Sequence, residues 1–130
     1  MEGFRKNALF FDAYKAHAIY GKKALSRSLA KKGMGIIVRD SLRNIHRFVM
    51  EHRVDRVVLF INDSNQLHTI LPFLNMGMRM LICSSENDVQ LNGTVDGKIE
   101  VIDMDIPKKE LFDSILSFLC AESKQGGLVS

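Results

Sequence analysis

Three aspartates, each at the end of an apolar segment, are the residues of this chain best suited to chemistry. Asp12 follows the run from Ala8, Asp40 follows Ile36–Val38 and an arginine, and Asp63 follows Val57–Ile61. Carboxylates brought together repel one another unless a divalent cation neutralises them, and hard oxygen ligands favour Mg²⁺ or Mn²⁺. Such an ion can activate water and clamp a phosphodiester. The three aspartates therefore predict a divalent metal site with hydrolytic chemistry.

The same aspartates can also be explained as helix caps. Each of them stands between a predicted strand and a predicted helix. A side-chain oxygen at that position accepts hydrogen bonds from the free N–H groups of the first helical turn. Metal binding and capping are therefore two alternatives that the sequence leaves open.

A strand–helix–strand unit spanning Val54–Ile82 organises the chain. Val57–Ile61 is rich in β-branched residues, which predicts a strand buried on both faces. Gln66–Asn75 has helical spacing, Gly77 suits the end of that helix, and Met78–Ile82 predicts the next strand. The apolar stripe expected to face the core from this helix is Leu67, Ile70, Leu71 and Leu74.

Similar units lie on both sides of this segment. Three further strands are expected at Ala8–Phe11, Ile36–Val38 and Lys98–Met104, and three further helices at Ala13–Lys32, Leu42–His52 and Lys108–Ala121. Gly21 could divide the first helix, Gly33 and Gly35 are expected to separate it from the next strand, and Asp40 or Ser41 is expected to cap the second helix. Cys83–Gly97 is predicted to be a long loop.

Alternating strands and helices predict a three-layer, doubly wound α/β fold of the flavodoxin-like or Rossmann-like kind. We expect a five-stranded parallel sheet with strand order 2-1-3-4-5. The length of 130 residues suits one domain, expected over residues 1–122, followed by a disordered tail at 123–130. No apolar run reaches the roughly 18 residues that span a bilayer, and no signal peptide is recognisable, so we expect a cytoplasmic protein with no membrane contact. Cys83 and Cys120 lack a partner motif and are expected to be buried thiols.

The charge is unevenly distributed along the chain. Residues 1–56 hold 13 Lys and Arg against 5 Asp and Glu, a net charge of +8, whereas residues 57–130 hold 5 against 10, a net charge of −5. A basic half of this kind can bind nucleic acid. The candidate phosphate contacts are Lys15, Lys22, Lys23, Arg39 and Arg43. Alternatively, these side chains simply solvate two outer helices.

Val54–Ile82 resembles the closing part of the NYN domains, which are relatives of the PIN nucleases. In that family an apolar strand is followed by Gly-Asp-Ser-Asp-Phe, an amphipathic helix, a glycine and another strand. The chain has Asn-Asp-Ser-Asn-Gln at this place, from Asn62 onward, and its earlier strand-and-aspartate pairs resemble those of the family. The resemblance implies that Asp12, Asp40 and Asp63 are catalytic and bind Mg²⁺ or Mn²⁺, with Asn65 as a further ligand, and that RNA is the substrate. Because Asn65 replaces an acid, an RNA-binding relative without nuclease activity is the alternative.

A second resemblance covers the whole chain. Ile102–Pro107 followed by Lys-Lys-Glu-Leu is similar to the last strand and helix of bacterial receiver domains. In that alignment the phosphoacceptor aspartate falls on Phe60, the conserved lysine of the family falls near Met104, and Ser84 matches the Ser/Thr switch position. Asp12 is a single acid where receivers carry a pair. Without a carboxylate nucleophile no aspartyl phosphate can form, so the resemblance implies an atypical receiver that acts by homodimerisation or by docking a protein partner.

Overall fold

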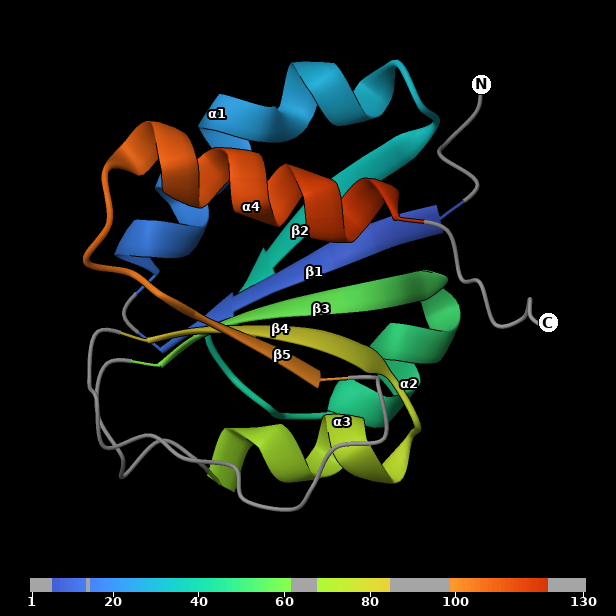
Figure 1. Ribbon diagram of the computed structural model, residues 1–130. Coiled ribbons are helices and arrows are strands. Elements are labelled where there is room, and N and C mark those ends of the chain that lie inside the picture. The colour runs from blue at the N-terminus through green and yellow to red at the C-terminus, as the bar shows by residue number, and fades with distance from the viewer. Residues whose placement is uncertain (1–5, 14, 62–67, 85–98, 122–130) are drawn as a thin grey trace, which may run out of the picture.

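Five strands form one parallel sheet in the order β2-β1-β3-β4-β5 in the computed structural model (Figure 1). Their bounds are β1 (Lys6–Asp12), β2 (Met34–Arg39), β3 (Val54–Ile61), β4 (Arg79–Ser84) and β5 (Ile99–Asp103). The structure describes residues 6–13, 15–61, 68–84 and 99–121. The predicted doubly wound, flavodoxin-like fold and its strand order are confirmed.

Helices cover both faces of the sheet, which gives three layers (Figure 1). The helices are α1 (Ala16–Ala30), α2 (Ile45–Glu51), α3 (Leu71–Asn75) and α4 (Lys108–Cys120). Helices α1 and α4 pack on one face, and α2 and α3 pack on the other. Among the described residues, none of the helices combines the length and the apolar character needed to cross a membrane.

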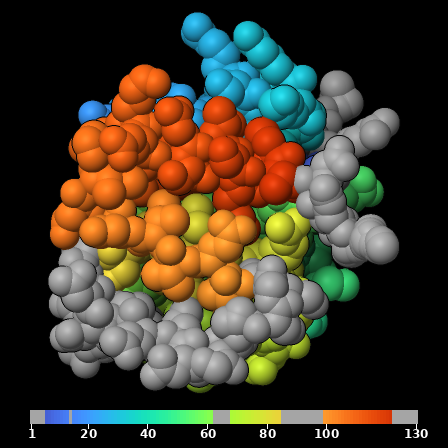
Figure 2. All heavy atoms as spheres, in the orientation of Figure 1, coloured from blue at the N-terminus to red at the C-terminus, as the bar shows by residue number. Residues whose placement is uncertain are grey.

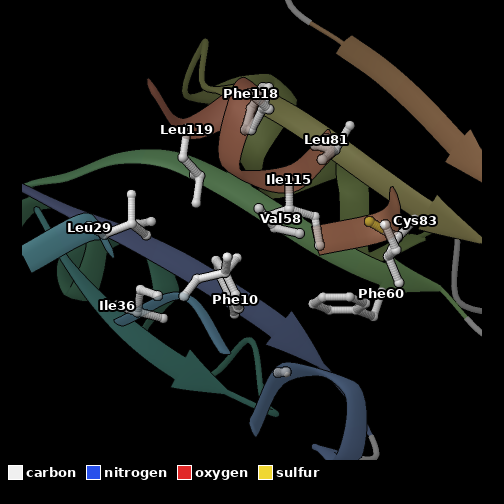
Figure 3. Packing of buried hydrophobic residues seen from close by; sticks show 14 of the residues in the cluster. Phe10, Leu29, Ile36, Val58, Phe60, Leu81, Cys83, Ile115, Phe118 and Leu119 are labelled. Carbon is white, nitrogen blue, oxygen red and sulfur yellow. The ribbon is translucent and has the colours of Figure 1, made fainter. Parts of the chain in front are cut away.

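The continuous apolar runs of the central strands follow from this double cover. Along β1, Ala8 and Phe10 point to the α1 and α4 side, while Leu9 and Phe11 point to the α2 and α3 side, and all four are buried. Figure 3 shows the first of these cores, where side chains of the strands meet those of the two helices. The labelled members are Phe10, Leu29, Ile36, Val58, Phe60, Leu81, Cys83, Ile115, Phe118 and Leu119.

Strand β5 is the less protected edge of the sheet. It pairs only with β4, and Glu100, Val101 and Asp103 are exposed. Figure 2 shows its atoms at the surface beside those of α4. An edge strand buries less of each face than a central strand does, which explains why β5 carries the exposed Glu100 and Asp103 while Val57–Ile61 of β3 is apolar at every position.

The expectation that Gly21 divides the first helix is wrong, because α1 runs unbroken from Ala16 to Ala30. Gly21 is buried against the sheet, and a Cβ atom on it would lie 3.0 Å from Cε2 of Phe10. The glycine is therefore a point of close approach between helix and strand. The expected break at Gly35 is also wrong, because Gly35 lies inside β2 and the chain turns only at Gly33, where φ is +77°.

Helix α3 buries a different face from the one predicted. Leu71 is 57% exposed and Leu74 is 38% exposed, whereas Phe73 is completely buried. The helix begins only at Leu71, with Pro72 in its first turn, so the spacing expected from a helix over 66–75 does not apply. Ile70 is buried as predicted, and Leu67 lies outside the described residues.

The two cysteines differ. Strand β4 continues through Cys83 to Ser84, where a loop was expected, and Cys83 is buried as predicted. Burial raises the pKa of the Cys83 thiol. Cys120 is exposed, so that prediction is wrong. It lies at the last position of α4, after the core-facing Leu119.

Candidate functional site at the carboxyl end of the sheet

Asp12 ends β1 and stabilises the start of α1. Its side chain is fully buried, and Oδ2 accepts hydrogen bonds from the backbone N–H groups of His17, at 2.9 Å, and Ala18, at 3.3 Å. The His17 ring nitrogen Nδ1 lies 3.7 Å from the same oxygen. These backbone groups have no acceptor within the helix, and a negative charge is favourable at a helix N-terminus. Of the two roles considered for Asp12, metal binding and helix capping, the hydrogen bonds correspond to helix capping.

Asp40 lies beside Asp12 at the same edge of the sheet. Phe11 and Arg39 are register partners, so the two aspartates follow paired positions on neighbouring strands. Lys15 connects them: its N–H donates to the Asp12 carbonyl at 3.0 Å, and its Nζ lies 3.6 Å from Oδ2 of Asp40. Because the side chains of Lys15 and Asp40 are about half exposed, water weakens this ion pair.

The predicted cap of α2 by Asp40 or Ser41 is wrong. The helix begins at Ile45, after Asn44 in a left-handed conformation with φ 54°. Ser41 Oγ instead accepts the N–H of Arg43 at 3.0 Å, which closes a turn ahead of the helix. The polar residues after β2 thus stabilise a loop and do not cap the helix directly.

Only two of the four predicted metal ligands, Asp12 and Asp40, belong to the described residues. Asp63 and Asn65 lie outside the described residues. Within the described ranges, no three His, Cys, Asp or Glu side chains are grouped so as to hold a metal ion. Asp12 already accepts two hydrogen bonds from α1, and Asp40 is paired with Lys15, so these two acids alone do not fit the predicted ligand set. The role of all four residues as ligands stays a prediction.

A phenylalanine lies next to Asp12 in the sheet. Phe60 of β3 is the register partner of Asp12 and is 2% exposed. Its ring stacks on His17, with centroids 5.9 Å apart and planes 16° apart, and meets Phe10 edge-on at 6.0 Å. Figure 3 shows Phe60 within the core on the α1 and α4 side. An apolar ring thus occupies the centre of this edge.

The neighbouring strands also present few reactive groups here. Ser84, at the end of β4, is 5% exposed, and its carbonyl accepts the N–H of Met104 at 3.0 Å. Met104 packs partly buried against the core, and Asp103 Oδ1 accepts the N–H of Asp105 at 2.8 Å. In the described part of this edge, therefore, the side chains serve packing and turn formation.

The five candidate phosphate contacts do not share one surface. Lys22 and Lys23 lie on α1, whereas Arg39 ends β2 and Arg43 precedes α2, on the other side of the sheet. Lys15 precedes α1 and lies at the edge between them, beside Asp40. Lys22 and Lys23 are exposed, and Lys15 is paired with Asp40. Nucleic-acid binding by this set stays a prediction.

The buried Arg56 was missed by sequence reasoning. Arg56 of β3 is 3% exposed, with Nε 3.2 Å from Oδ2 of Asp55 and Nη1 donating to the carbonyl of Phe118 near the end of α4. Burial lowers the pKa of Arg56, and the charge of Arg79 lowers it further. Its position directly before the apolar run Val57–Ile61 was the signal. Arg39 and Arg43 were predicted as phosphate contacts, and the structure places Arg47 and Glu51 beside them, at the four-residue spacing visible in the sequence.

The fold matches that of a known structure. The chain is similar to a response regulator receiver domain protein from Bacillus halodurans C-125, with 13% sequence identity and a TM-score of 0.58, over 90% of this chain and 97% of that one. At that identity the likeness concerns the fold. No model of a known protein family matches the sequence. No curated protein matches it either. The receiver resemblance is thus supported at the level of fold, and the NYN and PIN resemblance is not.

Proposed function

We propose that this chain is a receiver-like interaction domain that binds a protein partner and works without aspartyl phosphorylation. The observation that carries the proposal is the buried Phe60 ring next to Asp12. In the receiver alignment this is the phosphoacceptor position. A phenyl ring has no oxygen that could attack a phosphoryl donor, so the acyl phosphate of an ordinary receiver cannot form there.

The other described residues of this edge agree with a domain that has no phosphotransfer centre. Met104 stands near the position of the receiver lysine and packs against the core. Asp12 is a single acid, and its carboxylate is engaged by the first turn of α1. The packing that defines the fold is nevertheless complete, with a core on each face of the sheet. A domain that keeps the receiver-like fold but lacks the phosphotransfer residues is best explained as one that functions by binding a partner through its surface.

The first experiment exposes the chain to acetyl phosphate and Mg²⁺, and separately to beryllofluoride. Intact-mass spectrometry and ¹H–¹⁵N NMR spectra are then recorded. We expect no phosphoryl adduct and no shift of the signals around Asp12 and Phe60. A phosphoryl adduct that hydroxylamine removes, and that is absent in the Asp12→Asn variant or in a variant of the 62–67 segment, would overturn the proposal.

The second experiment separates partner docking from RNA hydrolysis. Single-stranded RNA is incubated with the chain and Mg²⁺ or Mn²⁺, with Asp12→Asn as the matched variant. We expect no cleavage by either protein. Metal-dependent cleavage that disappears in the variant would favour the nuclease alternative. Sedimentation velocity over a range of concentrations then tests whether the partner is a second copy, which would give a concentration-dependent dimer.

A further inference from the structure

An open pocket lies where β2 ends and α2 begins, at the edge of the sheet. Its volume is about 440 Å³. The residues that line this arginine pocket are Arg39, Ser41, Arg43, Asn44, Arg47, Phe48 and Glu51. Neither the fold comparison nor the proposed function assigns it a role. It is formed by the loop after Asp40 and by one side of α2.

Arg39 is held in place before any ligand arrives. Its guanidinium carbon lies 4.5 Å from the centre of the Phe48 ring, and Nη2 donates to the carbonyls of Ser41, at 3.0 Å, and Arg43, at 2.7 Å. The Phe48 ring is itself packed against His52, with ring centroids 4.1 Å apart. A side chain fixed in this way loses little entropy on binding.

The charge of Arg39 has no acidic counterpart in the described ion pairs. Its two hydrogen bonds to described residues go to neutral carbonyl oxygens, and both use Nη2. Among the described residues, its remaining N–H groups are therefore available to an anion. A fixed, partly buried guanidinium whose hydrogen bonds go to carbonyls keeps its net positive charge, which favours a negatively charged ligand.

The balance of charge in the pocket indicates which anion fits. Arg39, Arg43 and Arg47 contribute +3, and Glu51, whose Oε2 lies 3.4 Å from Nε of Arg47, contributes −1. The resulting +2 matches a phosphate monoester, which carries about −1.5 to −2 at neutral pH. A carboxylate or a phosphodiester carries a charge of −1 and would balance only half of the pocket's net charge of +2. Arginines also offer paired N–H groups that suit phosphate oxygens.

We propose that the arginine pocket binds the phosphorylated side chain of a protein partner. The proposal rests on the proposed function in one respect, namely that the partner is a protein. RNA is less well matched, because its phosphates form a chain that needs a track of cations. The lysines of α1 that could supply such a track lie on the opposite side of the sheet.

The test measures binding of a short, otherwise neutral peptide that carries one phosphoserine. Its unphosphorylated form, inorganic phosphate and a single-stranded oligonucleotide are compared with it by NMR titration at physiological salt. We expect saturable shifts of the signals of residues 39–48 and binding at least about tenfold tighter than that of the unphosphorylated peptide.

Two variants test the pocket directly. Arg43 and Arg47 are exposed, so Arg43→Gln and Arg47→Gln remove charge without disturbing the core. We expect each to weaken phosphopeptide binding about tenfold, which is the size of one charge-assisted hydrogen bond. Lys22→Gln and Lys23→Gln remove the same charge from the exposed side of α1 and are the matched controls, expected to leave binding unchanged.

Three outcomes would overturn the inference. The first is no binding of the phosphopeptide. The second is equal binding of inorganic phosphate, which would make the ligand a free anion. The third is tighter binding of the oligonucleotide with equal losses in the α1 and pocket variants, which would indicate general attraction of polyanions. None of these decides whether the chain accepts a phosphoryl group itself, so the proposed function is tested independently.

Discussion

Replacing Asp12 by alanine tests whether this carboxylate serves to hold α1 in place. The change removes the acceptor of two backbone hydrogen bonds, from His17 and Ala18, at a fully buried position. The loss of a helix cap costs about 0.5–2 kcal/mol. A buried donor left without an acceptor costs about 1–3 kcal/mol. Because both estimates describe the loss of the same acceptor, they are not added, and we expect Asp12→Ala to lower the free energy of unfolding by about 1–3 kcal/mol.

Asp12→Asn should be milder than Asp12→Ala. Asparagine keeps one acceptor oxygen in nearly the same place and loses the charge, which interacts with the helix N-terminus by up to about 1 kcal/mol. Asp40→Asn is the matched control, because Asp40 is exposed and paired only with the half-exposed Lys15 among the described ion pairs. A pair of this kind contributes about 0–1 kcal/mol.

The assay is urea unfolding followed by far-UV circular dichroism, with the slope m compared among variants. An unchanged m with a lower midpoint would show that the native state alone is affected. A loss of less than about 0.5 kcal/mol in Asp12→Ala would refute the capping argument. Equal losses in the Asp12 and Asp40 variants would show that the two acids act as one unit, which would favour a shared ligand.

Three further predictions concern the packing. Gly21→Ala should destabilise the fold by about 1 kcal/mol in the same urea assay, because the new methyl group would press on the buried Phe10 ring, and a gain in stability would show that the ring can move. Iodoacetamide should label the exposed Cys120 in the native protein but label Cys83 only after unfolding, because burial shields the Cys83 thiol and raises its pKa. Labelling is located by peptide mass spectrometry, and labelling of Cys83 in the native protein would contradict the prediction. Arg56→Met should cost about 1–3 kcal/mol of unfolding free energy, because a buried carbonyl at the end of α4 loses its donor; an unchanged urea midpoint would show that the guanidinium contributes nothing.

The arrangement of strands was predictable from local sequence. Val57–Ile61 is apolar at every position, which is expected only where helices cover both faces of a sheet, and β3 is indeed central. Helix α4 was predicted almost to the residue, and its buried residues, Leu111, Ile115, Phe118 and Leu119, have the spacing of one helix face. Both the apolar run of β3 and the helical spacing of α4 extend over many residues, so a single tertiary contact does not change the type of element that forms.

Single residues were less predictable, because their roles depend on partners distant in the chain. Gly21 suggested a break in α1 but permits close contact with Phe10 of another strand. Leu71 and Leu74 had the spacing of a buried stripe, yet Phe73 fills the core because α3 starts late. Helical spacing defines a face only when the first residue of the helix is known.

The candidate sites were likewise predictable in their place along the chain but not in the contacts of their side chains. The sequence by itself determined that Asp12 and Asp40 follow neighbouring strands, because strand ends and parallel order are local and topological properties. Only the tertiary structure decided that the Asp12 carboxylate is engaged by α1, that Phe60 fills the adjacent position, and that Arg39 lies over Phe48. Charges and rings act over a few ångströms, so their function depends on which side chains the fold brings within that distance.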